Sequence, residues 1–446
     1  MYLARGRMIF CGYLRSLSPK FSPLEQERTI FDSSNQPNGK TQSRSTSGGQ
    51  GYTLCVLLIL AATLLQKVAV PGTGGALSIT TVILPLLAFI AWCRSVLIID
   101  IYAFFGLVAF LTSSSISLYL NGSVNKISLS SVALFTFVQS SLIFRRLPYD
   151  TGFIKATSFY RDWMFILSMG GILQYTIQYV VPSSIAFPID HYLPDELKVT
   201  VYNNLNPLFY GSEIIKTNGI FFAEPSFFSQ FVGIALIYEL ATTQRMIRIF
   251  VFLTALLCSF SGTGIILVAF FGTYQVLKRL KFEVVVAGVA LALIVGVLGS
   301  MLQINALTER VNEFSTPNSS GHARFISIFG LLDAVTFTNL TLAFFGTGPG
   351  TISSYFLYLP YLVFDPTWGK ILFEYGIIGL LCYLYYFFVG IRGRENAVRG
   401  PLVMSFFLLG GYFLDGTILT LVAVLLVFQN PPKVYLVTKS RADRAM

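Results

Sequence analysis

Apolar runs long enough to cross a lipid bilayer recur along most of this chain, and they constrain its fold more than any other feature. The first begins near Tyr52, and about twelve can be counted, several of them shorter than the roughly 20 residues of a typical transmembrane helix. Charged residues make up only 12% of the chain, against about 25% in soluble proteins. We therefore predict an all-α polytopic membrane protein with about twelve transmembrane helices, which excludes secreted and cytosolic enzymes.

The basic residues predict how these helices are oriented. One side of the predicted arrangement holds 24 of the 31 Lys and Arg residues, and an excess of basic residues marks the cytoplasmic side. The net charge of +10 therefore reports orientation, and nothing indicates nucleic-acid binding. We predict a disordered cytoplasmic tail over 1–50, a transmembrane domain over 51–432 and a short cytoplasmic tail over 433–446.

Two long apolar stretches are predicted to be pairs of short helices. Basic residues flank the stretch 248–277 at both ends, so both ends are expected in the cytoplasm, and residues 261–264 supply the turn between them. The stretch 401–430 divides in the same way. On the outer face, long loops are predicted near 183–218 and 303–368, and because long loops often carry function, we expect the site there. The cysteines and the two histidines form no metal-binding pattern, so neither a metal nor a cofactor is predicted.

Glu224 is the first candidate for chemistry, because it follows the first outer loop and is expected about one turn inside an apolar run. An acid at membrane depth costs roughly 2.5–3.5 kcal/mol, so it normally faces a cavity or a cation. Pro225 is expected to open the helix there and free backbone groups to line a cleft. An interfacial acid that only reaches water is the open alternative.

The second candidate is the stretch from Arg310 to Arg324, which includes His322 and lies in the second outer loop. Arginine binds phosphate oxygens with a planar fork, and histidine can accept or position a proton near neutral pH. A solvated loop with an incidental histidine is the open alternative. Lys370 stands at the outer end of a late helix and is a further candidate for substrate binding, with helix-end snorkelling as its alternative.

Four short motifs resemble the O-antigen polymerase and O-antigen ligase-like family in their order and membrane placement. They are residues 219–226 (GIFFAEPS), 259–264 (SFSGTG), 346–350 (GTGPG) and 374–381 (EYGIIGLL). The resemblance implies a GT-C-like fold in the bacterial inner membrane with both termini cytoplasmic. It implies a metal-independent glycosyltransferase that polymerises polyprenyl-diphosphate-linked oligosaccharide repeat units into a surface polysaccharide, with a flippase and a chain-length regulator as candidate partners.

The same resemblance implies roles for individual residues. Lys216 stands where the family often has an arginine, and together with Arg310 and Arg324 it is expected to bind the diphosphate. Glu224 or His322 is expected to orient or deprotonate the acceptor hydroxyl. Two alternatives stay open: a ligase that moves a finished glycan to a lipid or protein, and a transporter of lipid-linked sugars, for which no internal repeat is visible.

Overall fold

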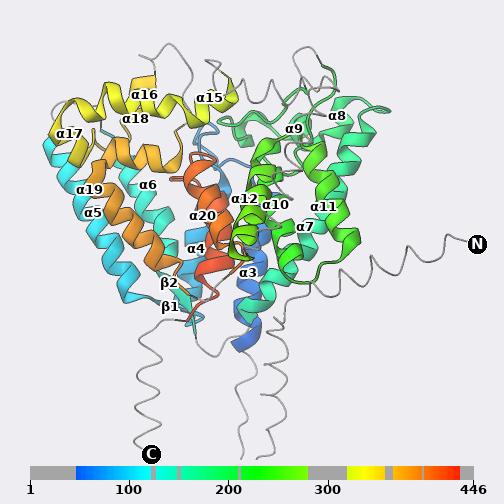
Figure 1. The fold of residues 1–446 in the computed structure, drawn as a ribbon, viewed down its shortest axis with the longest axis horizontal. Helices are drawn as coiled ribbons and strands as arrows, with labels where there is room; N and C mark the ends of the chain where they lie inside the picture. The colour runs from blue at the N-terminus through cyan, green and yellow to red at the C-terminus, as the bar shows by residue number, and fades with distance from the viewer. Residues whose placement is uncertain are drawn as a thin grey trace, which may run out of the picture. The chain divides into compact units, whose positions relative to one another are not determined.

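The computed structural model describes residues 47–121, 127–147, 152–208, 212–279, 319–356, 365–393 and 396–431. These residues are mostly helical, which agrees with the predicted all-α class (Figure 1). In chain order the elements are α3 (Ser47–Leu64), α4 (Ile79–Cys93), β1 (Leu97–Ile99), α5 (Ile101–Asn121), α6 (Leu129–Gln139), η1 (Ser140–Ile143), β2 (Phe144–Arg146), α7 (Gly152–Ile177), α8 (Ser183–Ala186), α9 (Pro188–Tyr192), η2 (Asp195–Leu197), α10 (Pro225–Ala241), α11 (Met246–Cys258), α12 (Gly262–Arg279), α15 (Ser320–Phe325), α16 (Ser327–Ala334), η3 (Thr336–Thr338), α17 (Leu340–Phe345), α18 (Ile352–Phe356), α19 (Thr367–Gly390), α20 (Arg399–Leu408), α21 (Gly416–Val422) and η4 (Ala423–Val427). The predicted tail over 433–446, nearly all of the tail over 1–50, the apolar run 283–302 and Arg310 lie outside the described residues.

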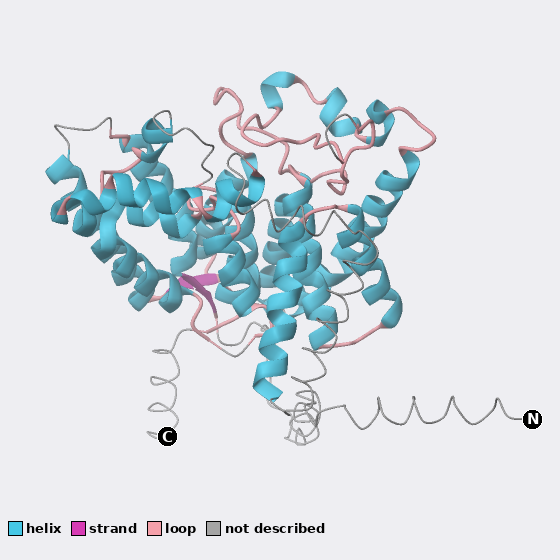
Figure 2. Cartoon of the chain, turned by 45° about the horizontal axis from the view of Figure 1, so that its top comes forward, coloured by secondary structure: helices cyan, strands magenta, loops and turns pink. Residues whose placement is uncertain are grey.

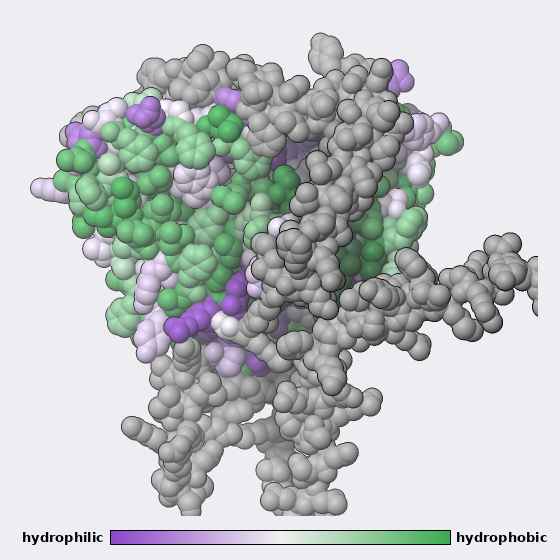
Figure 3. Space-filling view, viewed as in Figure 1, coloured by the Kyte–Doolittle hydropathy of each residue, from purple (hydrophilic) through white to green (hydrophobic). Residues whose placement is uncertain are grey.

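Two of the described helices, α5 and α19, are long and apolar enough to cross a membrane by length and composition. The other helices of the described ranges do not meet both conditions, and most of the remaining apolar helical stretches are 10–17 residues long. Large apolar side chains on α5 and α19 point outward, such as Phe105 (60% exposed) and Leu381 (61% exposed). Figure 3 shows this apolar surface with polar residues toward its two ends, which supports an association with a membrane.

The two predicted breaks in long apolar stretches are confirmed. The stretch 248–277 forms α11 and α12, which are separated by residues 259–261. The stretch 401–430 forms α20 and then α21, with an irregular segment of residues 409–415 between them.

Helix α10 is central to the packing, because all of its residues from Pro225 to Glu239 are buried. It packs against α7, α11 and α12. The contact with α12 is a backbone contact, since a Cβ added at Gly264 would lie 2.1 Å from the carbonyl oxygen of Ser229. A second packing unit joins α19 to α5, where Gly106 lies against the backbone of Tyr386 in the same manner.

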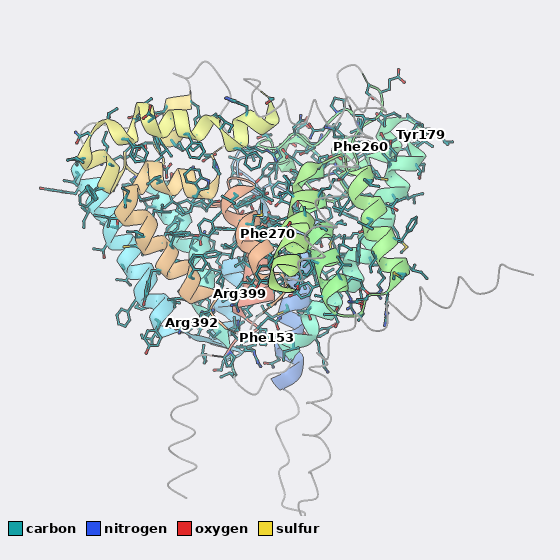
Figure 4. The ribbon with its side chains drawn as sticks, in the orientation of Figure 1. Phe153, Tyr179, Phe260, Phe270, Arg392 and Arg399 are labelled. Atoms are coloured by element: carbon teal, nitrogen blue, oxygen red, sulfur yellow. The ribbon has the colours of Figure 1, made fainter. Side chains whose placement is uncertain are left out.

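A short antiparallel pair of strands, β1 and β2, closes one end of the helices. Arg145 of β2 is buried and donates to Asp100 with an Nε–Oδ2 distance of 3.1 Å. Asp100 in turn accepts the backbone N–H of Tyr102 at 3.0 Å, so its carboxylate also caps the N-terminus of α5. Arg392 and Arg399 lie toward this same end (Figure 4).

The described parts of both predicted outer loops gather at the opposite end. Helices α8 and α9 belong to the first loop and α15 to α18 to the second, and Figures 1 and 2 place them together, away from β1 and β2. Tyr179 and Phe260 lie toward this loop end in Figure 4. The fold therefore brings two segments that are far apart in the sequence to one face.

Candidate functional site

Glu224 is the residue that immediately precedes α10, where the first loop enters the bundle. Its Oε1 accepts the backbone N–H of Asn203 at 3.1 Å, and its Oε2 accepts the hydroxyl of Ser226 at 2.8 Å. The prediction that Pro225 opens a helix was wrong. Proline is the first residue of α10, a position where its missing N–H leaves no helical hydrogen bond unmade. The acid therefore stands at the helix start and not one turn inside it.

Arg324 reaches Glu224 from the second loop. Its Nη2 lies 3.7 Å from Glu224 Oε2, and the two side chains are 25% and 16% exposed. The distance exceeds that of a hydrogen bond, so the contact is a loose ion pair. The structure thus places two of the predicted catalytic residues side by side, although they are 100 residues apart in the sequence.

His322 is carried by the same short helix as Arg324. Its backbone N–H donates to the hydroxyl of Ser319 at 3.2 Å, which caps the start of α15. Side chains two residues apart on a helix do not face each other. His322 and Arg324 therefore leave α15 in different directions, and of the two it is Arg324 that meets Glu224.

The segment that leads to Glu224 is fixed by an unusual backbone. Gly219 and Ile220 both have positive φ, at +63° and +70°, and this conformation strains a β-branched residue such as isoleucine. A Cβ at position 219 would lie 2.4 Å from the ring of Phe228. Gln174 of α7 holds the turn by accepting the hydroxyl of Thr217 and the N–H of Ile220. The segment is therefore anchored to both α7 and α10.

A buried ion pair holds the same segment in place. Lys67 Nζ lies 2.6 Å from Asp190 Oδ2, and both side chains are only 2% exposed. The same ammonium donates to the carbonyl of Ile220 at 2.6 Å. Asn218 donates to Asp190 as well, at 3.3 Å. Sequence reasoning missed this pair, although a lysine within apolar sequence was a signal that could have been followed.

Tyr202 and Asp415 form another contact between distant segments. The tyrosine hydroxyl donates to Asp415 Oδ2, while Asp415 Oδ1 accepts the N–H of Thr417 at 2.6 Å and so caps α21. Burial raises the pKa of Tyr202 well above its usual value, and the negative charge of Asp415 adds to this effect. The hydroxyl therefore stays protonated and remains a donor.

Lys370, a predicted substrate-binding residue, lies between two acids. Its Nζ is 3.0 Å from Asp365 Oδ2 and 3.7 Å from Glu374 Oε1, and Glu374 is buried. The backbone of Asp365 also lies against Gly411, close to where α21 begins. Two carboxylates thus already neutralise Lys370, which favours a structural role in this cluster over an open phosphate site.

The glycines of residues 346–350 form a tight packing loop. Gly346, Gly348 and Gly350 all have positive φ, and the N–H of Gly348 donates to the carbonyl of Glu374 at 3.0 Å. The loop fits a break in α19 at Gly376, whose φ is +67°. A Cβ at position 346 would lie 2.4 Å from the backbone there, so only glycine fits.

Lys216 is the remaining predicted site residue among those that the structure describes. Lys216 is half-buried, and its backbone N–H donates to the carbonyl of Asn206 at 2.8 Å. Among the residues that the structure describes, no three His, Cys, Asp or Glu side chains gather in a way that could hold a metal ion.

No model of a protein family matches the chain, and no curated protein matches it.

Proposed function

We propose that this chain is a membrane glycosyltransferase that polymerises polyprenyl-diphosphate-linked oligosaccharide repeat units on the outer face of the bacterial inner membrane. The observation that carries the proposal is the ion pair of Glu224 and Arg324. It combines a carboxylate at the start of α10 with a guanidinium on α15, and α15 lies at the end away from β1 and β2 (Figure 1). A carboxylate suits an acceptor hydroxyl, and a guanidinium suits a diphosphate.

The proposal includes about twelve transmembrane helices with both termini in the cytoplasm. Its support is that most of the longer helices run between the same two ends as α5 and α19 (Figure 1). Arg145 and Arg146 belong to β2, and Arg392 and Arg399 lie toward the same end, so by the positive-inside tendency we assign that end to the cytoplasm. The loop end is then outside, where lipid-linked repeat units are polymerised.

The two residues divide the chemistry of glycosyl transfer. The acceptor hydroxyl oxygen attacks the anomeric carbon of the donor sugar, the bond from that carbon to the diphosphate oxygen breaks, and the polyprenyl diphosphate leaves with the electron pair. Glu224 orients the hydroxyl and takes its proton, which contributes about 10²–10⁴-fold for a general base. Arg324 binds the diphosphate oxygens and stabilises the charge that develops on them.

The test is an extraction of lipid-linked oligosaccharides and surface glycan from cells that lack the gene. Single repeat units should accumulate and polymer should be absent, and the wild-type gene should restore polymer. Arg324→Ala and Glu224→Gln should fail to restore it while the protein remains in the membrane. Lys198→Ala is the control, because it removes a cation of the outer loops that is paired with the exposed Asp195 and not with Glu224, and it should restore polymer fully.

Other outcomes of this extraction would overturn the proposal in distinct ways. Long lipid-linked chains that never reach a final acceptor would identify a ligase, which uses the same donor chemistry with another acceptor. Repeat units that accumulate only on the cytoplasmic leaflet would identify a flippase. Polymer of normal length in the Arg324→Ala strain would show that the ion pair of Glu224 and Arg324 is not needed for the reaction.

A further inference from the structure

The hydrogen bond from Asn203 to Glu224 is a backbone contact made by an exposed residue, and it needs something to hold it in place. The preceding residue, Tyr202, supplies that support. Its hydroxyl donates to Asp415, which is 8% exposed and caps α21. Its ring packs edge-on against Phe227 of α10, with ring centroids 5.1 Å apart. Tyr202 is thus fixed to two buried helices.

These contacts form a continuous chain from the bundle to the candidate base. Asp415 is fixed by α21, Asp415 fixes the hydroxyl of Tyr202, and the backbone of Tyr202 sets the position of the N–H that Glu224 Oε1 accepts. The other oxygen of Glu224 is shared by Ser226 and Arg324. Without the Asn203 contact, the carboxylate could rotate about its terminal torsion, which is soft.

We infer that Tyr202 and Asp415 are positioning residues that hold Glu224 in the orientation needed to accept the proton of the acceptor hydroxyl. The inference rests on the proposed function only for the role of Glu224. Tyr202 and Asp415 act through the Asn203 N–H, so their loss changes the rate of the chemical step and leaves donor binding by Arg324 intact. A displacement of about 1 Å in a reacting group can cost about 10²-fold in rate.

Steady-state kinetics of the purified full-length protein with a lipid-linked repeat unit test the positioning role. Tyr202→Phe removes only the hydroxyl and keeps the ring on Phe227. We expect kcat to fall by about 10- to 100-fold with KM unchanged. Tyr238→Phe is the matched control: it removes another buried tyrosine hydroxyl of the same bundle, bonded to Asn396 at 3.0 Å and near the far end of α10, and kcat should stay at the wild-type value.

A double-mutant comparison tests whether the two residues act through one interaction. Asp415→Ala should lower kcat at least as much as Tyr202→Phe, and the double variant should be no slower than Asp415→Ala alone. If Asp415→Ala does not fold, Asp415→Asn keeps the helix cap and replaces it in the comparison. Losses of kcat that multiply in the double variant would overturn the shared interaction.

Amide hydrogen exchange gives a readout that does not depend on activity. In peptides that cover residues 199–208, the Asn203 amide should exchange faster in Tyr202→Phe than in the wild type, and Tyr238→Phe should not change it. Wild-type kcat and wild-type exchange in Tyr202→Phe would refute the inference. The wild type could instead make no polymer while the Asn203 amide still exchanges faster in Tyr202→Phe. In that case the proposed function fails, and the structural link from Tyr202 to Glu224 stands.

Discussion

Breaking the buried pair of Lys67 and Asp190 should destabilise the protein strongly, because it leaves an uncompensated charge. Both side chains are 2% exposed, with Nζ and Oδ2 2.6 Å apart. Asp190→Asn keeps the volume and removes the negative charge, and breaking such a pair typically costs about 3–5 kcal/mol. With an unfolding entropy of about 2.1 cal/mol/K per residue over roughly 400 residues, the melting temperature should fall by about 4–6 °C.

The assay is thermal unfolding of the detergent-purified full chain, followed by far-UV circular dichroism. Asp195→Asn is the control, because its partner Lys198 lies at a similar 2.8 Å while Asp195 itself is 92% exposed, and it should not shift the melting temperature. Adding Lys67→Met to Asp190→Asn should recover part of the loss, since no lone charge remains. Equal shifts for the two Asp→Asn variants would refute the argument that burial decides the cost.

Three further substitutions test the packing and the site. Gly376→Ala forces a positive φ on alanine at the break of α19 and should cost about 1–3 kcal/mol, measured as a lower melting temperature. Gly264→Ala should push α12 away from Ser229 and destabilise by about 1–3 kcal/mol in the same assay, whereas Gly272→Ala, which has open space around it, should not. Arg324→Lys keeps the charge and loses the fork, so polymer synthesis in cells should fall at least about tenfold.

Features that depend on local sequence could be predicted. The breaks between α11 and α12 and between α20 and α21 follow from flanking charges and small residues, and both lie within a few residues of the predicted positions. The start of α10 was missed, because an apolar run does not reveal where its helix begins. In this run the turn at Gly219 precedes the helix, and Pro225 marks its first residue.

Pairings between distant residues could not be predicted. Glu224 and Arg324 were each singled out by residue type, but the sequence holds no signal that they meet. Asp415 and Tyr202 are separated by more than 200 residues, and no sequence pattern links them. Such pairs depend on how two loops fold over the bundle, and periodicity describes only one element at a time.

Glu224 and Arg324 are held by different contacts. Glu224 accepts hydrogen bonds on both carboxylate oxygens, from Asn203 and Ser226. The segment before it is held by the hydrogen bond from Lys67 to the carbonyl of Ile220. Arg324 approaches the same carboxylate only at 3.7 Å and is the more exposed partner. An anionic diphosphate would compete with Glu224 for the guanidinium. In that competition Glu224 would keep its hydrogen bonds from Asn203 and Ser226, so donor binding and base positioning depend on different contacts.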